Sequence, residues 1–78
     1  MKTKIIEIRE NEYKGEIYKI IDFLWIGDEP RFTYMSPKYY SDWCKKIGVA
    51  QLNKGMLIDV FESSNKRNFK IVGITKNE

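Results

Sequence analysis

The chain has 78 residues, its formal net charge is +3 at pH 7, and 42% of its residues are hydrophobic. A chain of this length forms one domain, residues 1–78, and buries only about 60% of the surface that it exposes when unfolded. No apolar run approaches the about 20 residues of a membrane-spanning helix, and the charged N-terminal stretch lacks the pattern of a signal peptide. The single cysteine, Cys44, excludes a disulfide within the chain. We therefore expect a soluble protein of the reducing cytoplasm, without a membrane partner.

The first two segments are predicted to be strands. Residues 2–10 alternate between apolar and charged side chains. A polar turn, residues 11–15, separates them from residues 15–26, which are rich in β-branched and aromatic side chains. The alternation slips at Ile20 and Ile21, which indicates a bend or a bulge. A helix is the alternative for this second segment, since its isoleucines also fit helical spacing. We favour a strand, because a glycine bounds the segment on each side and no capping residue precedes it.

The strongest helix signal covers residues 37–47, after a turn at 27–30 and a short third strand at 31–35. Ser36 is a good N-cap, because its hydroxyl can accept a hydrogen bond from the first turn. Gly48 is the residue expected just past the C-terminus, where φ becomes positive. The residues at the spacing of one buried helix face, which we expect in the core, are Tyr40, Trp43, Cys44 and Ile47.

The remainder of the chain is predicted to form two further strands. A connector, residues 49–55, leads to a fourth strand at 56–61, and a hairpin loop at 63–66 leads to a fifth at 68–76, with a bulge at Gly73. The order β-β-β-α-β-β is typical of a small, mainly β, five-stranded OB-like barrel with one helix between strands 3 and 4. An SH3-like barrel also has five strands, but this helix position does not suit it.

Catalysis has little support in the sequence. The chain contains no histidine, the commonest general base. Cys44 is the only thiol, and it lacks a histidine to activate it. The carboxylates do not have the spacing of metal ligands, and no glycine-rich phosphate loop occurs. We therefore expect a protein that is not an enzyme and that carries no cofactor and no metal.

Binding has more support, because the two tryptophans, five tyrosines and four phenylalanines are too many for a small core to hide. Exposed rings beside basic residues are typical of sites for single-stranded nucleic acid. In an OB-fold the face of strands 2 and 3, the loop after strand 1 and the last hairpin loop form the ligand surface. The alternative is that the rings fill the barrel and the basic residues are simply solvated. The candidate nucleic-acid-binding residues are Tyr13, Lys14, Tyr18, Lys19, Trp25, Arg31, Phe32, Tyr34, Lys66, Arg67 and Lys70.

Two of these candidates flank the same turn. Trp25 precedes the turn at 27–30 and Phe32 follows it, so pairing of strands 2 and 3 is expected to bring their rings near each other.

A resemblance to a known family covers roughly the last half of the chain. The passage Trp43–Ile47 through Leu52–Val60 resembles the helix-to-strand-four passage of bacterial single-stranded-DNA-binding proteins: a tryptophan-led helix, then a leucine, then Lys54-Gly55 before an alternating strand. The chain departs from the family in its shorter length, in lacking the flexible acidic-tipped tail, and in having Glu62 where a glycine is usual after strand four. The resemblance implies an OB-fold with affinity for single strands, as a replication accessory encoded by a phage or mobile element.

Two functions from different classes remain open at this point. The first is a non-catalytic module that binds single-stranded DNA or RNA by base stacking and phosphate contacts. The alternative is a small protein-binding adaptor, subunit or inhibitor that acts on a larger replication enzyme, with the same rings as interface anchors.

Overall fold

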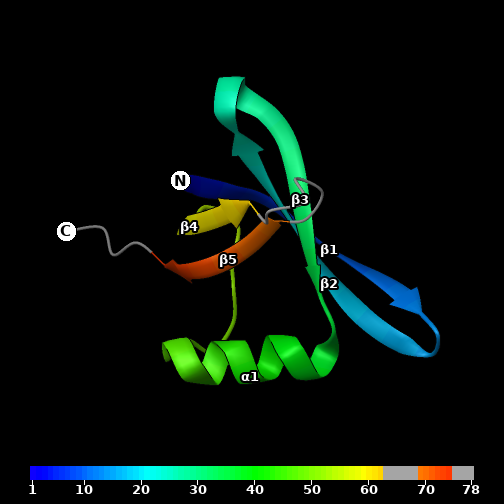
Figure 1. Ribbon diagram of the computed structural model, residues 1–78. Coiled ribbons are helices and arrows are strands. Elements are labelled where there is room, and N and C mark those ends of the chain that lie inside the picture. The colour runs from blue at the N-terminus through cyan, green and yellow to red at the C-terminus, as the bar shows by residue number, and fades with distance from the viewer. Residues whose placement is uncertain (63–68, 75–78) are drawn as a thin grey trace.

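A computed structural model of the chain describes residues 1–62 and 69–74, and over these ranges it shows five strands and one α-helix (Figure 1). The elements are β1 (Lys2–Tyr13), β2 (Glu16–Trp25), a 3₁₀ turn (Ile26–Asp28), β3 (Glu29–Met35), α1 (Pro37–Ile47), β4 (Leu57–Glu62) and β5 (Phe69–Ile74). The predicted order of strands and helix is therefore confirmed, and the helical alternative for the second segment is wrong.

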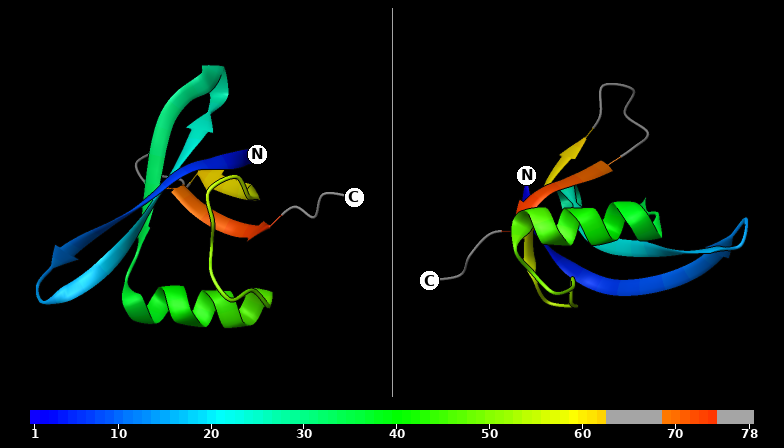
Figure 2. Two further views of the ribbon diagram at one scale, coloured as in Figure 1. Left: turned by 180° about the vertical axis from the view of Figure 1, so that it is seen from behind. Right: turned by 90° about the horizontal axis from the view of Figure 1, so that it is seen from below.

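The five strands form one antiparallel sheet in the order β3-β2-β1-β4-β5. β1 is the central strand, and it pairs with β2 along most of its length but with β4 only through Lys2–Lys4. The end of the β1–β2 hairpin consequently extends beyond the rest of the molecule (Figures 1 and 2). The helix α1 lies below the sheet in the view of Figure 1 and connects β3 to β4.

Two irregularities interrupt the pairing of strands. In the β1–β2 ladder the register shifts between Ile5 and Glu7, so the extra residue belongs to β1 and not to Ile20–Ile21 in β2, where we expected it. In the β4–β5 ladder the register shifts next to Gly73, which confirms the expected bulge. A bulge reverses which face the following side chains occupy, so the β1 bulge decides the composition of the outer face of the sheet.

The edge strands β3 and β5 approach each other without forming a ladder among the described residues. The hydroxyl of Thr33 donates a hydrogen bond of 2.6 Å to the carbonyl of Phe69, which joins the two edges at one point. The sheet is therefore curled, and its backbone pairing leaves it open between β3 and β5 in residues 1–62 and 69–74.

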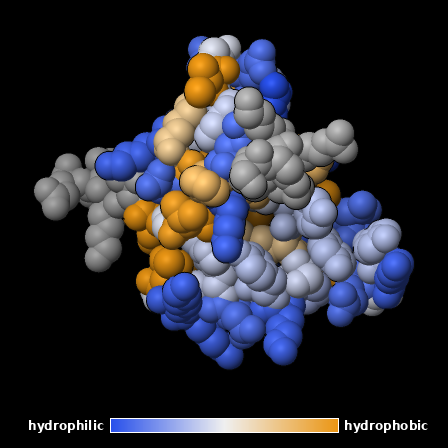
Figure 3. All heavy atoms as spheres, viewed as in Figure 1, coloured by the Kyte–Doolittle hydropathy of each residue, from blue (hydrophilic) through white to orange (hydrophobic). Residues whose placement is uncertain are grey.

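The helix has the termini that its sequence predicts. The Ser36 hydroxyl accepts a hydrogen bond of 3.3 Å from the backbone N–H of Tyr39. At the other end Gly48 has φ +91°, and its N–H donates to the carbonyl of Cys44 at 2.8 Å. These contacts satisfy groups that a helix end leaves without partners. The side of α1 that faces away from the sheet is hydrophilic (Figure 3).

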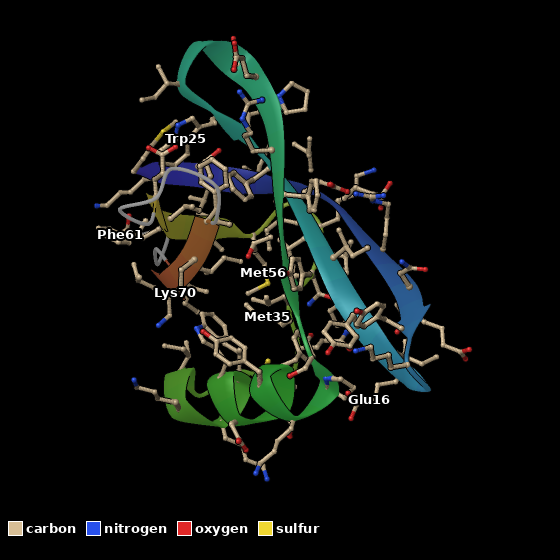
Figure 4. The ribbon with its side chains drawn as sticks, turned by 45° about the vertical axis from the view of Figure 1, so that its right-hand side comes forward. Glu16, Trp25, Met35, Met56, Phe61 and Lys70 are labelled. Atoms are coloured by element: carbon tan, nitrogen blue, oxygen red, sulfur yellow. The ribbon has the colours of Figure 1, made fainter. Side chains whose placement is uncertain are left out.

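The core lies between the inner face of the sheet and α1. Its fully buried side chains are Ile5, Ile21, Phe23, Ile58, Val60 and Ile71. Trp43 of α1 is 8% exposed, and its indole N–H donates a hydrogen bond of 3.0 Å to the carbonyl of Ile71. The prediction that Trp43 belongs to the core is confirmed. Met35 and Met56 lie in the space between sheet and helix (Figure 4).

The connector between α1 and β4 is tied to the helix by one side chain. The Tyr40 hydroxyl accepts a hydrogen bond of 2.8 Å from the backbone N–H of Leu52, whose side chain is buried. Burial raises the pKa of the Tyr40 phenol. In the described part of the chain, no helix is long and apolar enough to cross a membrane.

Candidate functional site

Exposed rings gather on the outer face of β2 and β3. On β2, Ile21 and Phe23 point into the core, so the alternating residues Tyr18 and Ile20 point outward. On β3, Thr33 and Met35 are buried, and the residues that alternate with them, Phe32 and Tyr34, are 54% and 59% exposed. Large apolar side chains are normally covered when they occur in a group, so this group is a candidate binding surface.

The first strand adds three more side chains to this face. Because the bulge before Glu7 shifts the alternation, Arg9, Asn11 and Tyr13 share the outer face with the rings of β2 and β3. Arg9 lies directly opposite Ile20 in the ladder, and Asn11 lies opposite Tyr18.

We call this surface the aromatic face. Its side chains line a hollow of about 580 Å³ and are Arg9, Asn11, Tyr13, Tyr18, Ile20, Phe32 and Tyr34.

Three tyrosine rings run across the three strands. The rings of Tyr13 and Tyr18 have centroids 5.9 Å apart at an interplanar angle of 86°, and those of Tyr18 and Tyr34 are 6.1 Å apart at 55°. Edge-on and tilted rings do not stack flat on one another, and the two outer rings, Tyr13 and Tyr34, are 56% and 59% exposed. The row therefore leaves π surface available to a flat ligand. The ammonium of Lys14 lies 5.3 Å from the Tyr13 centroid, at one end of the row.

A second hollow continues the surface past Tyr34 toward β5. It has a volume of about 420 Å³ and shares Tyr18 and Tyr34 with the aromatic face. Tyr39 at the start of α1 and Lys70 of β5 also line it. Lys70 lies on the opposite side of the molecule from Glu16 at the hairpin end (Figure 4). The two hollows thus form a continuous path from the tip of the β1–β2 hairpin to the edge of β5.

Most cations near this path are paired with carboxylates. The Arg9 guanidinium donates two hydrogen bonds to Asp22, at 2.7 and 2.8 Å, and these raise the pKa of Arg9. The Lys19 ammonium donates to Glu10 at 2.7 Å, and this bond raises the pKa of Lys19. Arg31 pairs with Glu29 in its own strand. Local positive charge is therefore modest, although no carboxylate among the described residues pairs with Lys14.

Three candidate residues lie away from the aromatic face. Trp25 shares the inner face with Phe23, and its ring makes edge contacts with Phe23 and with Phe69 of β5, at centroid distances of 6.2 and 4.9 Å. The ammonium of Lys19, also on the inner face, lies 5.6 Å from the Tyr40 centroid. Arg31 lies two residues before the buried Thr33 on β3, so it is on the inner side of that strand.

The expected proximity of Trp25 and Phe32 is wrong, because Trp25 pairs with Glu29 while Phe32 pairs with Asp22 on the opposite face. Lys66 and Arg67 lie outside the described residues.

Sequence reasoning missed Arg9, Asn11 and Asp22. The first strand was expected to end at Glu10, whereas it continues to Tyr13. The alternation of Arg9, Asn11 and Tyr13 would have indicated the longer strand. The bulge that turns these side chains outward depends on pairing with β2, which the local sequence does not specify.

Clusters of metal-ligating side chains are absent from the described part of the chain. No group of three or more histidine, cysteine or acidic residues there could hold a metal ion. Cys44 is buried, and its thiol is free. Chemically, the aromatic face can stack flat groups and donate or accept a few hydrogen bonds.

Comparison of the chain with protein-family models, with curated proteins and with solved structures finds no match. The resemblance to single-stranded-DNA-binding proteins therefore stays a prediction. The aromatic face and its charges are the observations on which an assignment of function has to rest.

Proposed function

We propose that the chain is a non-catalytic module that binds single-stranded nucleic acid along the aromatic face. The observation that carries this proposal is the row of Tyr13, Tyr18 and Tyr34 on the outer surface of three strands. Tyr13, Tyr34 and the neighbouring Phe32 are exposed, and Tyr18 between them is half-buried. Stacking of a base on an aromatic side chain typically contributes about 1–3 kcal/mol. Two or three such contacts suffice for weak to moderate affinity.

The fold supports the proposal. We infer that the curled sheet is an OB-like barrel, because the helix lies between β3 and β4 and the edge strands β3 and β5 meet at the Thr33–Phe69 hydrogen bond. In OB-folds, ligands bind on the face of strands 2 and 3. The aromatic face occupies the corresponding surface.

Phosphate contacts in this proposal come from the two ends of the path. Lys14 stands beside Tyr13 at the hairpin tip, and Lys70 lines the hollow beyond Tyr34. Lys66 and Arg67 precede Lys70 in the sequence and remain candidates for the same role. The context that we infer is a cytoplasmic replication accessory of a phage or mobile element.

A second candidate function is a protein-binding adaptor for a larger replication protein. The observation that favours it is the pairing of Arg9, Lys19 and Arg31 with carboxylates, which leaves little positive charge to attract a polyanion. Tyrosines with few free charges around them are also typical of the centres of protein interfaces.

Fluorescence anisotropy with a labelled oligothymidylate of about 15 nucleotides, at low and moderate salt, separates the two candidates. We expect binding that Tyr34→Ala weakens by about 5- to 150-fold, the loss of one stacked base. Phe61→Ala is the matched control, because Phe61 is 58% exposed on β4, away from the aromatic face (Figure 4). Equal losses in both variants, or no binding by the parent at any salt concentration, would refute the nucleic-acid proposal and favour the protein partner.

The contribution of phosphate contacts has its own test. For single strands, each lost contact reduces the slope of log K against log salt by about 0.7. The double variant Lys66→Ala and Arg67→Ala is expected to lower this slope, whereas Tyr34→Ala is expected to leave it nearly unchanged, because stacking releases few counterions. A double variant that binds like the parent would remove these two residues from the site.

A further inference from the structure

Arg9 is held in one orientation on the aromatic face. From β1 it reaches across the face to Asp22 of β2, and its Nε and Nη2 atoms lie 2.7 and 2.8 Å from the two carboxylate oxygens. The guanidinium also lies 6.0 Å from the centroid of Phe32 on β3. The Asp22 side chain is only 18% exposed and that of Arg9 is 53% exposed. The carboxylate is thus shielded behind the guanidinium, whose remaining part faces the hollow.

The pairing with Asp22 leaves a defined set of donors on Arg9. A guanidinium has five N–H groups in a planar fork, and the bidentate pair uses one on Nε and one on Nη2. Three N–H groups are left: the two on Nη1 and the second one on Nη2. They lie along the other edges of the planar guanidinium. Since Asp22 balances the charge, these donors are better suited to a neutral acceptor pair than to a phosphate. A preoriented fork also loses less side-chain entropy on binding.

The strand register places these remaining donors of Arg9 beside a part of the hollow that has room for one base. Ile20 lies opposite Arg9 on one side and opposite Tyr34 on the other, so the three residues form a row across the hollow. Two strand spacings of about 4.8 Å separate the backbones of Arg9 and Tyr34. A base over Ile20 would contact the Tyr34 ring and turn one edge toward Arg9.

We propose that Arg9, positioned by Asp22, reads guanine, so that the aromatic face selects single strands that contain this base. This inference rests on the proposed nucleic-acid function and goes further by naming the preferred base. On the Hoogsteen edge, the one read in the major groove of a duplex, guanine is the base that presents two neighbouring acceptors, O6 and N7, to an arginine fork. Adenine places an amino donor beside N7, cytosine places an amino donor at the same edge, and thymine offers only O4.

The test compares single-stranded oligonucleotides of about 15 nucleotides that are identical except for one central base. Four strands are used, each with thymines on both sides of one central base. The central base is guanine, adenine, thymine or 7-deazaguanine, and 7-deazaguanine lacks the N7 acceptor. A bidentate contact predicts about 5- to 150-fold tighter binding of the guanine strand than of the adenine strand. The 7-deazaguanine strand is expected to lose most of that advantage.

Variants connect the preference to the fork. Arg9→Lys keeps the charge but not the fork, so it is expected to lose the preference for the guanine strand over the adenine and thymine strands. Asp22→Asn is expected to reduce the preference and to steepen the salt dependence, because the guanidinium is no longer neutralised. Arg31→Lys is the matched control, since Arg31 also pairs with a carboxylate but lies off the aromatic face. Circular dichroism melts confirm that each variant is folded.

The outcomes separate the two proposals. Equal binding of the four strands by the parent would overturn the guanine inference and leave the nucleic-acid function standing. A preference that survives in Arg9→Lys, or that Arg31→Lys abolishes, would also overturn it. If no strand binds, the proposed function itself fails.

Discussion

Replacement of Trp43 by phenylalanine tests how the helix is held to the sheet. The change removes the indole N–H, which donates a hydrogen bond of 3.0 Å to the carbonyl of Ile71. Both groups are buried, and an unsatisfied buried polar group costs about 1–3 kcal/mol. The smaller ring also leaves space, and Trp43→Ala, which removes the whole side chain, is expected to cost about 3–5 kcal/mol. Domains are typically stable by about 5–15 kcal/mol, so the alanine variant would keep at most about 2 kcal/mol of stability in a domain at the lower end of that range.

Urea denaturation followed by far-UV circular dichroism measures these losses. We expect the midpoint to fall for Trp43→Phe and to fall further for Trp43→Ala, with an unchanged slope for the phenylalanine variant. Phe61→Ala is the control, because exposed substitutions usually change stability by less than about 0.5 kcal/mol. A Trp43→Phe variant as stable as the parent would show that the indole hydrogen bond contributes nothing and that the argument from burial is wrong.

Three further substitutions test other contacts, each by the same denaturation assay. Gly48→Ala is expected to destabilise the fold by about 1–2 kcal/mol, because Gly48 has φ +91°; no loss would contradict this. Thr33→Val, which breaks the hydrogen bond to Phe69 between the two sheet edges, is expected to cost about 1 kcal/mol, and an unchanged midpoint would argue against that joint. Burial raises the pKa of the Tyr40 phenol above its value in the unfolded chain. The stabilisation that Tyr40 gives the folded state is therefore fully present below about pH 10 and is lost as pH rises through the folded pKa. Tyr40→Phe should weaken this alkaline loss and cost about 1 kcal/mol through the unsatisfied N–H of Leu52; an identical pH profile would contradict the assignment.

Local signals explain what the sequence predicted correctly. The helix ends follow from Ser36 and Gly48, which act within one turn of the chain. The second strand begins after Gly15, which has φ +80°, a value that glycine adopts without strain.

What the sequence did not predict depends on contacts between distant residues. The bulge in β1 exists only in the ladder with β2, and without it Arg9 would lie on the inner face. The turn between β2 and β3 contains two residues with positive φ, Gly27 and Asp28, and its geometry sets the register that separates Trp25 from Phe32. The candidate site was therefore anticipated in its aromatic residues and not in its polar ones.

The central strand β1 has an edge with consequences for self-association. Beyond the short pairing at Lys2–Lys4, one side of β1 has no neighbouring strand among the described residues, although it continues to Tyr13. Unpaired edges invite strand addition by other copies and, ultimately, aggregation. Glu7, Glu10 and Glu12 lie along this stretch, so two copies pairing edge to edge would bring carboxylates together. Charged side chains on a strand edge disfavour such pairing, so these acidic residues are expected to oppose the addition of a second copy to β1.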